Sequence, residues 1–123
     1  MTEPSPKELR VDPAPSKVFS WLHWCEEAPA VLDERGRTIQ PAGSCITARY
    51  RTTGAEWCAW PCSEETAVRI MRPGAEFDYS SGRAWSQLVI PRMNKRLVKP
   101  GERQETKRQR EQAEQQAGRR WLA

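Results

Sequence analysis

The side chains with the most obvious chemistry are the four cysteines and the one histidine. His23 stands two residues before Cys25, and Cys58 stands four residues before Cys62. Zinc prefers tetrahedral nitrogen and thiolate donors, which proteins usually supply in closely spaced pairs. The candidate ligands of a zinc site are therefore His23, Cys25, Cys58 and Cys62. We favour the alternative, in which the thiols pack as small hydrophobic side chains, and we predict no metal and no cofactor.

The sequence does not favour an enzyme. A Cys or Ser nucleophile needs a neighbouring base, and His23 is the only imidazole available. No Gly-x-Ser-x-Gly, P-loop or Gly-x-Gly-x-x-Gly pattern occurs. The acidic pairs Asp33-Glu34 and Glu64-Glu65 are typical of a turn and of a helix start. We therefore predict a binding protein without catalytic residues.

The charges are distributed unevenly along the chain. The 123 residues contain 20 Lys+Arg and 16 Asp+Glu, a formal net charge of +4. Residues 1–91 hold 10 basic and 12 acidic side chains, whereas residues 92–123 hold 10 basic and 4 acidic ones. A basic extension on a nearly neutral body is typical of a segment that meets nucleic acid or another polyanion. Nucleic acid is thus the first predicted partner.

Two groups of basic residues are candidates for that contact. Arg49 and Arg51 are two residues apart on an expected strand and so share one face. The second group of basic residues lies further along the chain, between residues 92 and 110. Arg and Lys neutralise phosphates and release counterions, while tryptophans such as Trp57, Trp60 and Trp85 either stack on unpaired bases or fill the core. The candidate nucleic-acid-binding residues are Arg49, Arg51, Arg92, Lys95, Arg96, Lys99, Arg103, Lys107, Arg108 and Arg110.

The two ends of the chain suggest an alternative function. A Pro-rich arm precedes the body, and the C-terminal segment finishes with Trp121 and Leu122, an apolar pair suited to docking on a protein surface. This pattern favours a structural, assembly or host-interaction protein, for example a phage virion component. A protein partner or a homo-oligomer is therefore the second predicted partner, and Trp121 and Leu122 are its candidate docking residues.

The secondary structure expected from the sequence indicates one small α+β domain, which would position these residues. Residues 1–16 are expected to be an extended Pro-rich arm, residues 17–91 the core domain, and residues 92–123 a basic helical tail. Residues 45–60 predict a β-hairpin whose turn at 52–54 uses Gly54. Ser63 predicts a helix N-cap. Residues 17–24 fit a strand or a short helix, and residues 75–91 a short helix or a loop with a helical turn. The fold class is thus α+β, a small antiparallel sheet packed on one or two helices.

The order of elements over residues 44–89 resembles the KTSC family, a short domain of bacterial and phage proteins. The family pattern has a strand, a turn glycine, a strand with paired aromatics, a proline-led helix and a Ser-x-Gly-x-aromatic-aromatic-polar turn. Only Trp57 is aromatic where the family has a Tyr-x-Tyr pair. The resemblance implies an α+β fold and no established activity, with RNA binding as the suggested role. The matching residues are Ile46, Ala48, Tyr50, Gly54, Trp57, Pro61, Ser80, Gly82, Trp85, Ser86 and Val89.

The location expected from the sequence is the cytoplasm, or a virion if the protein is encoded by a phage. No stretch approaches the ~20 apolar residues of a transmembrane helix, and the N-terminus lacks the apolar segment of a secretory signal. The cysteines are therefore expected to be reduced thiols, and no membrane partner is predicted.

Overall fold

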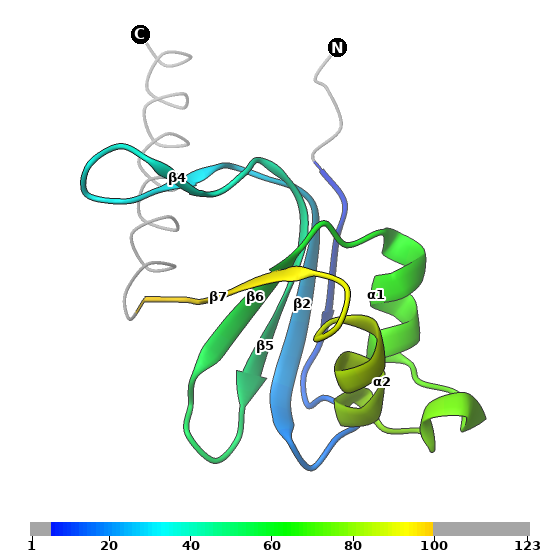
Figure 1. Ribbon diagram of the computed structural model, residues 1–123. Helices are drawn as coiled ribbons and strands as arrows, with labels where there is room; N and C mark the ends of the chain where they lie inside the picture. The colour runs from blue at the N-terminus through cyan, green and yellow to red at the C-terminus, as the bar shows by residue number, and fades with distance from the viewer. Residues whose placement is uncertain (1–5, 100–123) are drawn as a thin grey trace, which may run out of the picture.

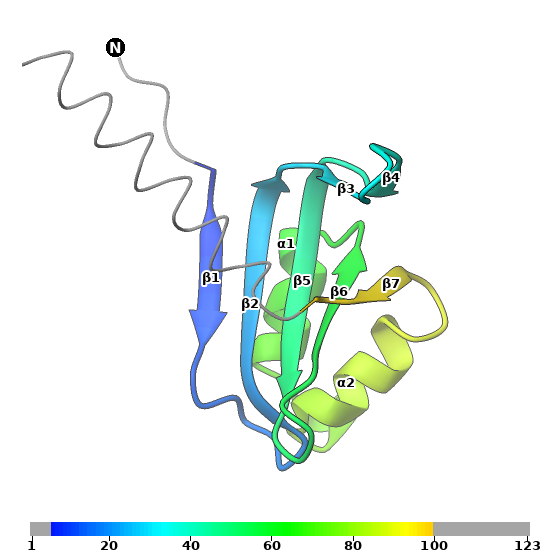
Figure 2. The ribbon, with the colours of Figure 1, turned by 90° about the vertical axis from the view of Figure 1, so that its left-hand side faces the viewer.

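A computed structural model describes residues 6–99 of the chain. It has an α+β fold, as predicted, in which an antiparallel sheet of strand order β1-β2-β5-β6-β7 packs on two helices (Figure 1). The sheet consists of β1 (Glu8–Val11), β2 (Phe19–Ala28), β5 (Gly43–Tyr50), β6 (Glu56–Trp60) and β7 (Asn94–Leu97). The remaining elements are β3 (Val31–Leu32), β4 (Thr38–Gln40), α1 (Glu64–Met71), the 3-10 turn η1 (Ala75–Phe77) and α2 (Ser81–Leu88). Both helices lie behind the sheet in the view of Figure 2.

The predicted hairpin is confirmed as β5 and β6. Gly54 has φ +70°, the left-handed conformation that the turn requires and that glycine adopts without strain. Ile46 and Ala48 are fully buried on the helix side of the sheet, as their alternation predicts. Arg51 departs from the prediction, because β5 ends at Tyr50 and Arg51 begins the turn. Its Nε donates to the carbonyl oxygens of Phe19 and Ser16 at 2.9 and 3.2 Å, so Arg51 does not share a strand face with Arg49.

Residues 17–24 contribute the start of β2, a strand and not a helix. Leu22 and Trp24 point into the core, and Trp21 lies on the opposite face, as alternation predicts. The same alternation predicts Phe19 on the face of Trp21, yet Phe19 is buried in the core. The reason is an irregularity in the β2–β5 register between Phe19 and Trp21, which breaks the two-residue alternation.

The two helices cover one face of the sheet with short amphipathic stripes. The Ser63 side chain accepts from the Thr66 N–H, which confirms the predicted N-cap of α1. Ser80 caps α2 in the same way. Ala67 and Ile70 of α1 and Trp85 of α2 are buried against the sheet, forming one core with Leu22 and Ile46. No helix within residues 6–99 has the length and apolar character of a membrane span.

The arm and the start of the tail both contribute to the sheet. Residues 8–11 are extended, as predicted, and in addition pair with β2 as an edge strand. Residues 94–97 form β7, not helix, because their backbone pairs with the other sheet edge at β6. The prediction of a helical tail is therefore wrong for these residues. The rest of that prediction, over residues 100–123, lies outside the described residues, as do residues 1–5.

A buried hydroxyl joins the two helices and gives a first testable prediction. Ser81 is fully buried, and its Oγ donates to the Ile70 carbonyl oxygen near the end of α1 at 2.7 Å. Ser81→Ala should lower the free energy of unfolding by about 1–3 kcal/mol, because a buried acceptor loses its donor. Ser86→Ala is the matched control, since the Ser86 hydroxyl is exposed and bonds only within α2. Urea denaturation measures both, and equal effects would contradict a role for the Ser81 bond.

Candidate functional site

The face of the five-stranded sheet opposite α1 and α2, here called the outer face, carries most of the chemistry. A single row of directly paired residues crosses all its strands. Arg10 of β1 pairs with His23 of β2, which pairs with Thr47 of β5. Thr47 pairs with Cys58 of β6, which pairs with Arg96 of β7. The row therefore runs from one arginine to another across the whole sheet, whose strands Figure 2 shows side by side.

A second, shorter row adds an aromatic ring and another arginine. Trp21 of β2 pairs with Arg49 of β5, which pairs with Glu56 of β6. The Arg10 guanidinium carbon lies 4.8 Å from the centroid of the Trp21 ring, a cation–π arrangement. Arg49 is exposed. The outer face thus presents two exposed arginines beside the buried Trp21 indole, with Glu56 in the same row.

The predicted nucleic-acid-binding residues do not all lie on this face. Arg49 and Arg96 do, and Arg96 also donates from Nε to Gln40 Oε1 at 2.7 Å. Lys95 pairs with Ala59 on the helix side, and its Nζ donates to the Ile90 carbonyl oxygen at 2.9 Å. Arg92 and Lys99 are exposed beyond the sheet rows. The others lie outside the described residues: Arg103, Lys107, Arg108 and Arg110, as do the docking candidates Trp121 and Leu122.

The tryptophans expected as stacking platforms are mostly covered. Trp85 is 2% exposed and belongs to the main core. Trp57 is half-buried against the same core, and Trp60 is half-buried against the cysteines of the outer face. Trp21, which is not among the predicted stacking residues, lies next to exposed cations but is itself only 9% exposed. Its alternation with Leu22 on β2 is the signal that could have found it.

The proposed zinc ligands are divided between the two faces of the sheet. Cys25 and Cys58 lie on the outer face, whereas Cys62 is fully buried in the main core, with its backbone carbonyl accepting from Trp24 Nε1 at 2.8 Å. Over residues 6–99, no three His, Cys, Asp or Glu side chains are placed to hold a metal ion. The structure therefore does not bring the four candidate ligands together.

A different cysteine completes the group on the outer face. Cys45 is the direct cross-strand partner of Cys25, and Cys45, Cys25 and Cys58 pack in one buried cluster with Val98. We call Cys25, Cys45 and Cys58 the thiol cluster. Cys45 is not among the predicted ligands, although strand alternation in the predicted hairpin puts Cys45 and Thr47 on one face. Aligning the two hairpin strands, so that Cys58 faces Thr47, would have brought Cys45 and Cys58 together.

The thiols of the cluster differ in acidity. A hydrogen bond from the Cys45 thiol lowers the pKa of Cys58 to about 6, supported by the Thr47 hydroxyl and the charge of Arg96. The same hydrogen bond raises the pKa of Cys45, and burial adds to that rise. Burial raises the pKa of Cys62 to about 12. The surroundings therefore favour the thiolate form at Cys58 and the protonated thiol at Cys45.

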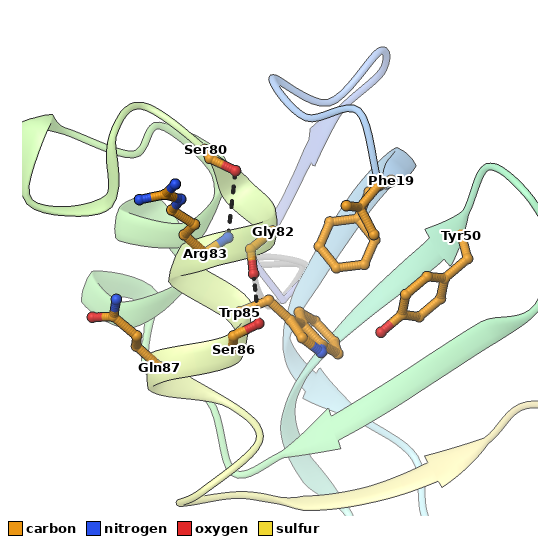
Figure 3. A pocket seen from close by; sticks show the side chains of 9 residues that line it. Phe19, Tyr50, Ser80, Gly82, Arg83, Trp85, Ser86 and Gln87 are labelled. Atoms are coloured by element: carbon orange, nitrogen blue, oxygen red, sulfur yellow. Dashed lines mark hydrogen bonds between the residues drawn. The ribbon is translucent and has the colours of Figure 1, made fainter.

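A pocket of about 480 Å³ opens beside α2, at the end of the sheet where β2 begins (Figure 3). Phe19, Tyr50 and Trp85 form its aromatic wall, with ring centroids 5.0 Å apart for Phe19–Tyr50 and 5.4 Å apart for Phe19–Trp85. Burial raises the pKa of Tyr50. The polar rim comes from α2 and its cap, and most of the lining belongs to the residues that carry the KTSC resemblance, namely Tyr50, Ser80, Gly82, Trp85 and Ser86.

Comparison with known proteins gives no relative for the chain: no family model, no curated protein and no solved structure matches it. The membership of the KTSC family accordingly stays a prediction.

Proposed function

We propose that the protein is a non-enzymatic module that binds nucleic acid, or a similar polyanion, through the outer face and the basic C-terminal segment. The observation that carries this proposal is the cross-strand row that begins at Arg10 and ends at Arg96. Arg49 stands beside the row next to Trp21. The proposal retains Arg49 and Arg96 from the predicted residues, omits Arg51 and adds Arg10.

The spacing and the residue types support a flexible strand as the ligand. Adjacent strands lie about 4.8 Å apart, so the row from β1 to β7 spans roughly 19 Å. Arginine forks pair with phosphate oxygens. The Arg10 guanidinium lies over the ring of the buried Trp21, a cation–π contact that holds this arginine on the outer face. A single-stranded segment lying along the row therefore fits better than a rigid duplex.

The basic C-terminal segment supports the same proposal through charge. Residues 92–123 carry 10 basic and 4 acidic side chains. This segment includes β7, the strand at the edge of the sheet next to β6. Its cations add long-range attraction that raises the association rate and depends on salt. The RNA-binding role implied by the KTSC resemblance agrees with this arrangement.

The test is the salt dependence of binding by the full chain, measured as fluorescence anisotropy of a labelled single-stranded RNA. Affinity should fall steeply with salt, by a logarithmic slope of about 0.7 for each phosphate neutralised. Replacing Arg103, Lys107, Arg108 and Arg110 with alanine should weaken binding about tenfold or more and flatten that slope. The matched control removes four exposed cations elsewhere: Lys17, Arg35, Arg37 and Arg72.

Two results would contradict the proposal. One is that the full chain does not bind the RNA at low salt, and the other is that the two four-residue variants lose equal amounts of RNA affinity. Absence of RNA and DNA binding together with a firm protein partner or a large oligomer would favour the assembly role. Deleting Trp121 and Leu122 should then abolish that association.

A further inference from the structure

The thiol cluster lies in the middle of the outer face, and Cys45 stands between the other two cysteines. Cys45 pairs directly with Cys25 across β2 and β5. Cys58 of β6 pairs with Thr47, which is two residues along β5 from Cys45 and points to the same face. The three side chains are 4–8% exposed and contact one another, with Val98 packed against them. Three adjacent thiols without a disulfide are an arrangement that oxidation can change.

The surroundings of Cys58 favour its anion. Arg96 lies opposite on β7 and Thr47 opposite on β5, so a cation and a hydroxyl donor flank the sulfur. Cys45 and Cys58 lie on adjacent strands in the same packed cluster, because Cys58 faces Thr47, which is two residues from Cys45 on the same face of β5. The charged and titratable groups that share the outer face with Cys58 are Glu8 and Arg10 on β1, His23 and Cys25 on β2, Cys45 and Arg49 on β5, Glu56 on β6 and Arg96 on β7.

We infer that Cys58 and Cys45 are a peroxide-reactive dithiol that closes into an intramolecular disulfide between β6 and β5. The Cys58 thiolate attacks one oxygen of a hydroperoxide, so that an S–O bond forms and the O–O bond breaks. The other oxygen leaves and, with one proton, becomes an alcohol or water. The Cys58 sulfur loses two electrons and becomes a sulfenic acid.

The second step uses Cys45, a thiol of the same packed cluster. The Cys45 sulfur attacks the Cys58 sulfur, an S–S bond forms, and the sulfenic hydroxyl leaves as water with the Cys45 proton. Overall, two thiols and one hydroperoxide give one disulfide, one alcohol or water, and one further water. An external dithiol reverses the change. This reactivity is independent of the proposed nucleic-acid binding, because no step involves that ligand.

Burial limits the size of an oxidant that can reach Cys58, and it makes Cys62 the less reactive of the two thiols. Cys58 is 4% exposed on the outer face, so the reagent must be small, and hydrogen peroxide is close to water in size. Cys62 is fully buried in the main core, where its Sγ donates to the Ser63 carbonyl oxygen at 3.6 Å. Cys62 also lacks a neighbouring cation among its described contacts. It is therefore the internal reference for an unreactive thiol.

The experiment treats the reduced full chain with hydrogen peroxide, blocks the remaining thiols with an alkylating reagent, and identifies disulfide-linked peptides by mass spectrometry. The wild-type protein should lose two thiols and give the Cys45–Cys58 peptide pair. Cys58→Ser should slow thiol loss by about tenfold or more. Cys45→Ser should stop at a Cys58 sulfenic acid, which a 1,3-diketone traps. Cys25→Ser and Cys62→Ser should oxidise like the wild type.

The pH dependence gives a readout that does not require a substitution. The pKa of Cys58 is lowered from 9.0 to about 6, so the rate should rise with pH and reach half its maximum near pH 6. A half-maximal rate near pH 9, the ordinary pKa of a cysteine thiol, would overturn the proposal. So would unchanged thiols, a disulfide that contains Cys25 or Cys62, or oxidation of Cys62 as fast as that of Cys58.

Discussion

Replacing Trp85 with alanine is expected to lower the free energy of unfolding by about 3–5 kcal/mol, the upper range for truncating one buried side chain. Trp85 is 2% exposed and is the one aromatic side chain that α2 contributes to the main core, beside Ala84 and Leu88. Its ring meets Phe19 edge-on, with centroids 5.4 Å apart and an interplanar angle of 63°. The truncation removes this contact and leaves a cavity between helix and sheet, which the short α2 cannot close by moving, because Ser81 ties its start to α1.

Guanidinium denaturation of the wild type and the variant measures this loss. Tyr79→Ala is the control, because Tyr79 is a large aromatic side chain close to α2 that is 70% exposed. It should change stability by less than about 0.5 kcal/mol. Small domains are stable by only about 5–15 kcal/mol, so Trp85→Ala should also leave a measurable unfolded population. A loss below about 1 kcal/mol would mean that α2 is not anchored through this ring.

Local signals are enough to predict the hairpin and the first helix. The alternation of Ile46, Ala48 and Tyr50 places one face in the core, and Gly54 marks the turn. Ser63 marks the N-cap. These features depend on neighbours in sequence, namely the pleat of a strand, a positive φ and a capping hydroxyl. Such features can be predicted from the sequence because they do not depend on a partner residue far away in the chain.

The predictions that fail depend on pairing between distant segments. Arg10 and Arg96 are 86 positions apart, and only the order of the strands brings them to opposite ends of one row. Phe19 turns inward through an irregularity of the β2–β5 register, which its own residues do not reveal. Strand β7 forms because its backbone pairs with the edge of β6, although its residues lie in the segment predicted as a helical tail. In each case the tertiary context decides against the local preference.

The four candidate zinc ligands are separated for a related reason. Spacing along the chain suggests that Cys58 and Cys62 form one clip, but β6 ends between them and Cys62 enters the main core. Cross-strand register instead joins Cys45 to Cys25 and Cys58. Sequence proximity is a good guide to ligands on a loop and a poor one on a strand, where alternate residues face opposite sides.

The largest functional effect is expected from removing Arg10 and Arg49 together. Both flank Trp21 on the outer face, Arg10 by stacking on its ring and Arg49 by pairing across β2 and β5. The double alanine variant should weaken RNA binding roughly tenfold to a hundredfold at low salt. Its logarithmic salt slope should fall by about 1.4, because two phosphate contacts on a single strand contribute about 0.7 each.

The matched control is Arg72→Ala with Arg83→Ala, which removes the same charge from exposed positions at α1 and α2, behind the sheet in Figure 2. If binding follows net charge alone, the two double variants weaken it equally and the outer face has no special role. If the outer face is the contact surface, the control keeps nearly the wild-type slope. The slope separates these outcomes better than the affinity does, because it counts the phosphates actually contacted, whereas affinity also responds to long-range attraction.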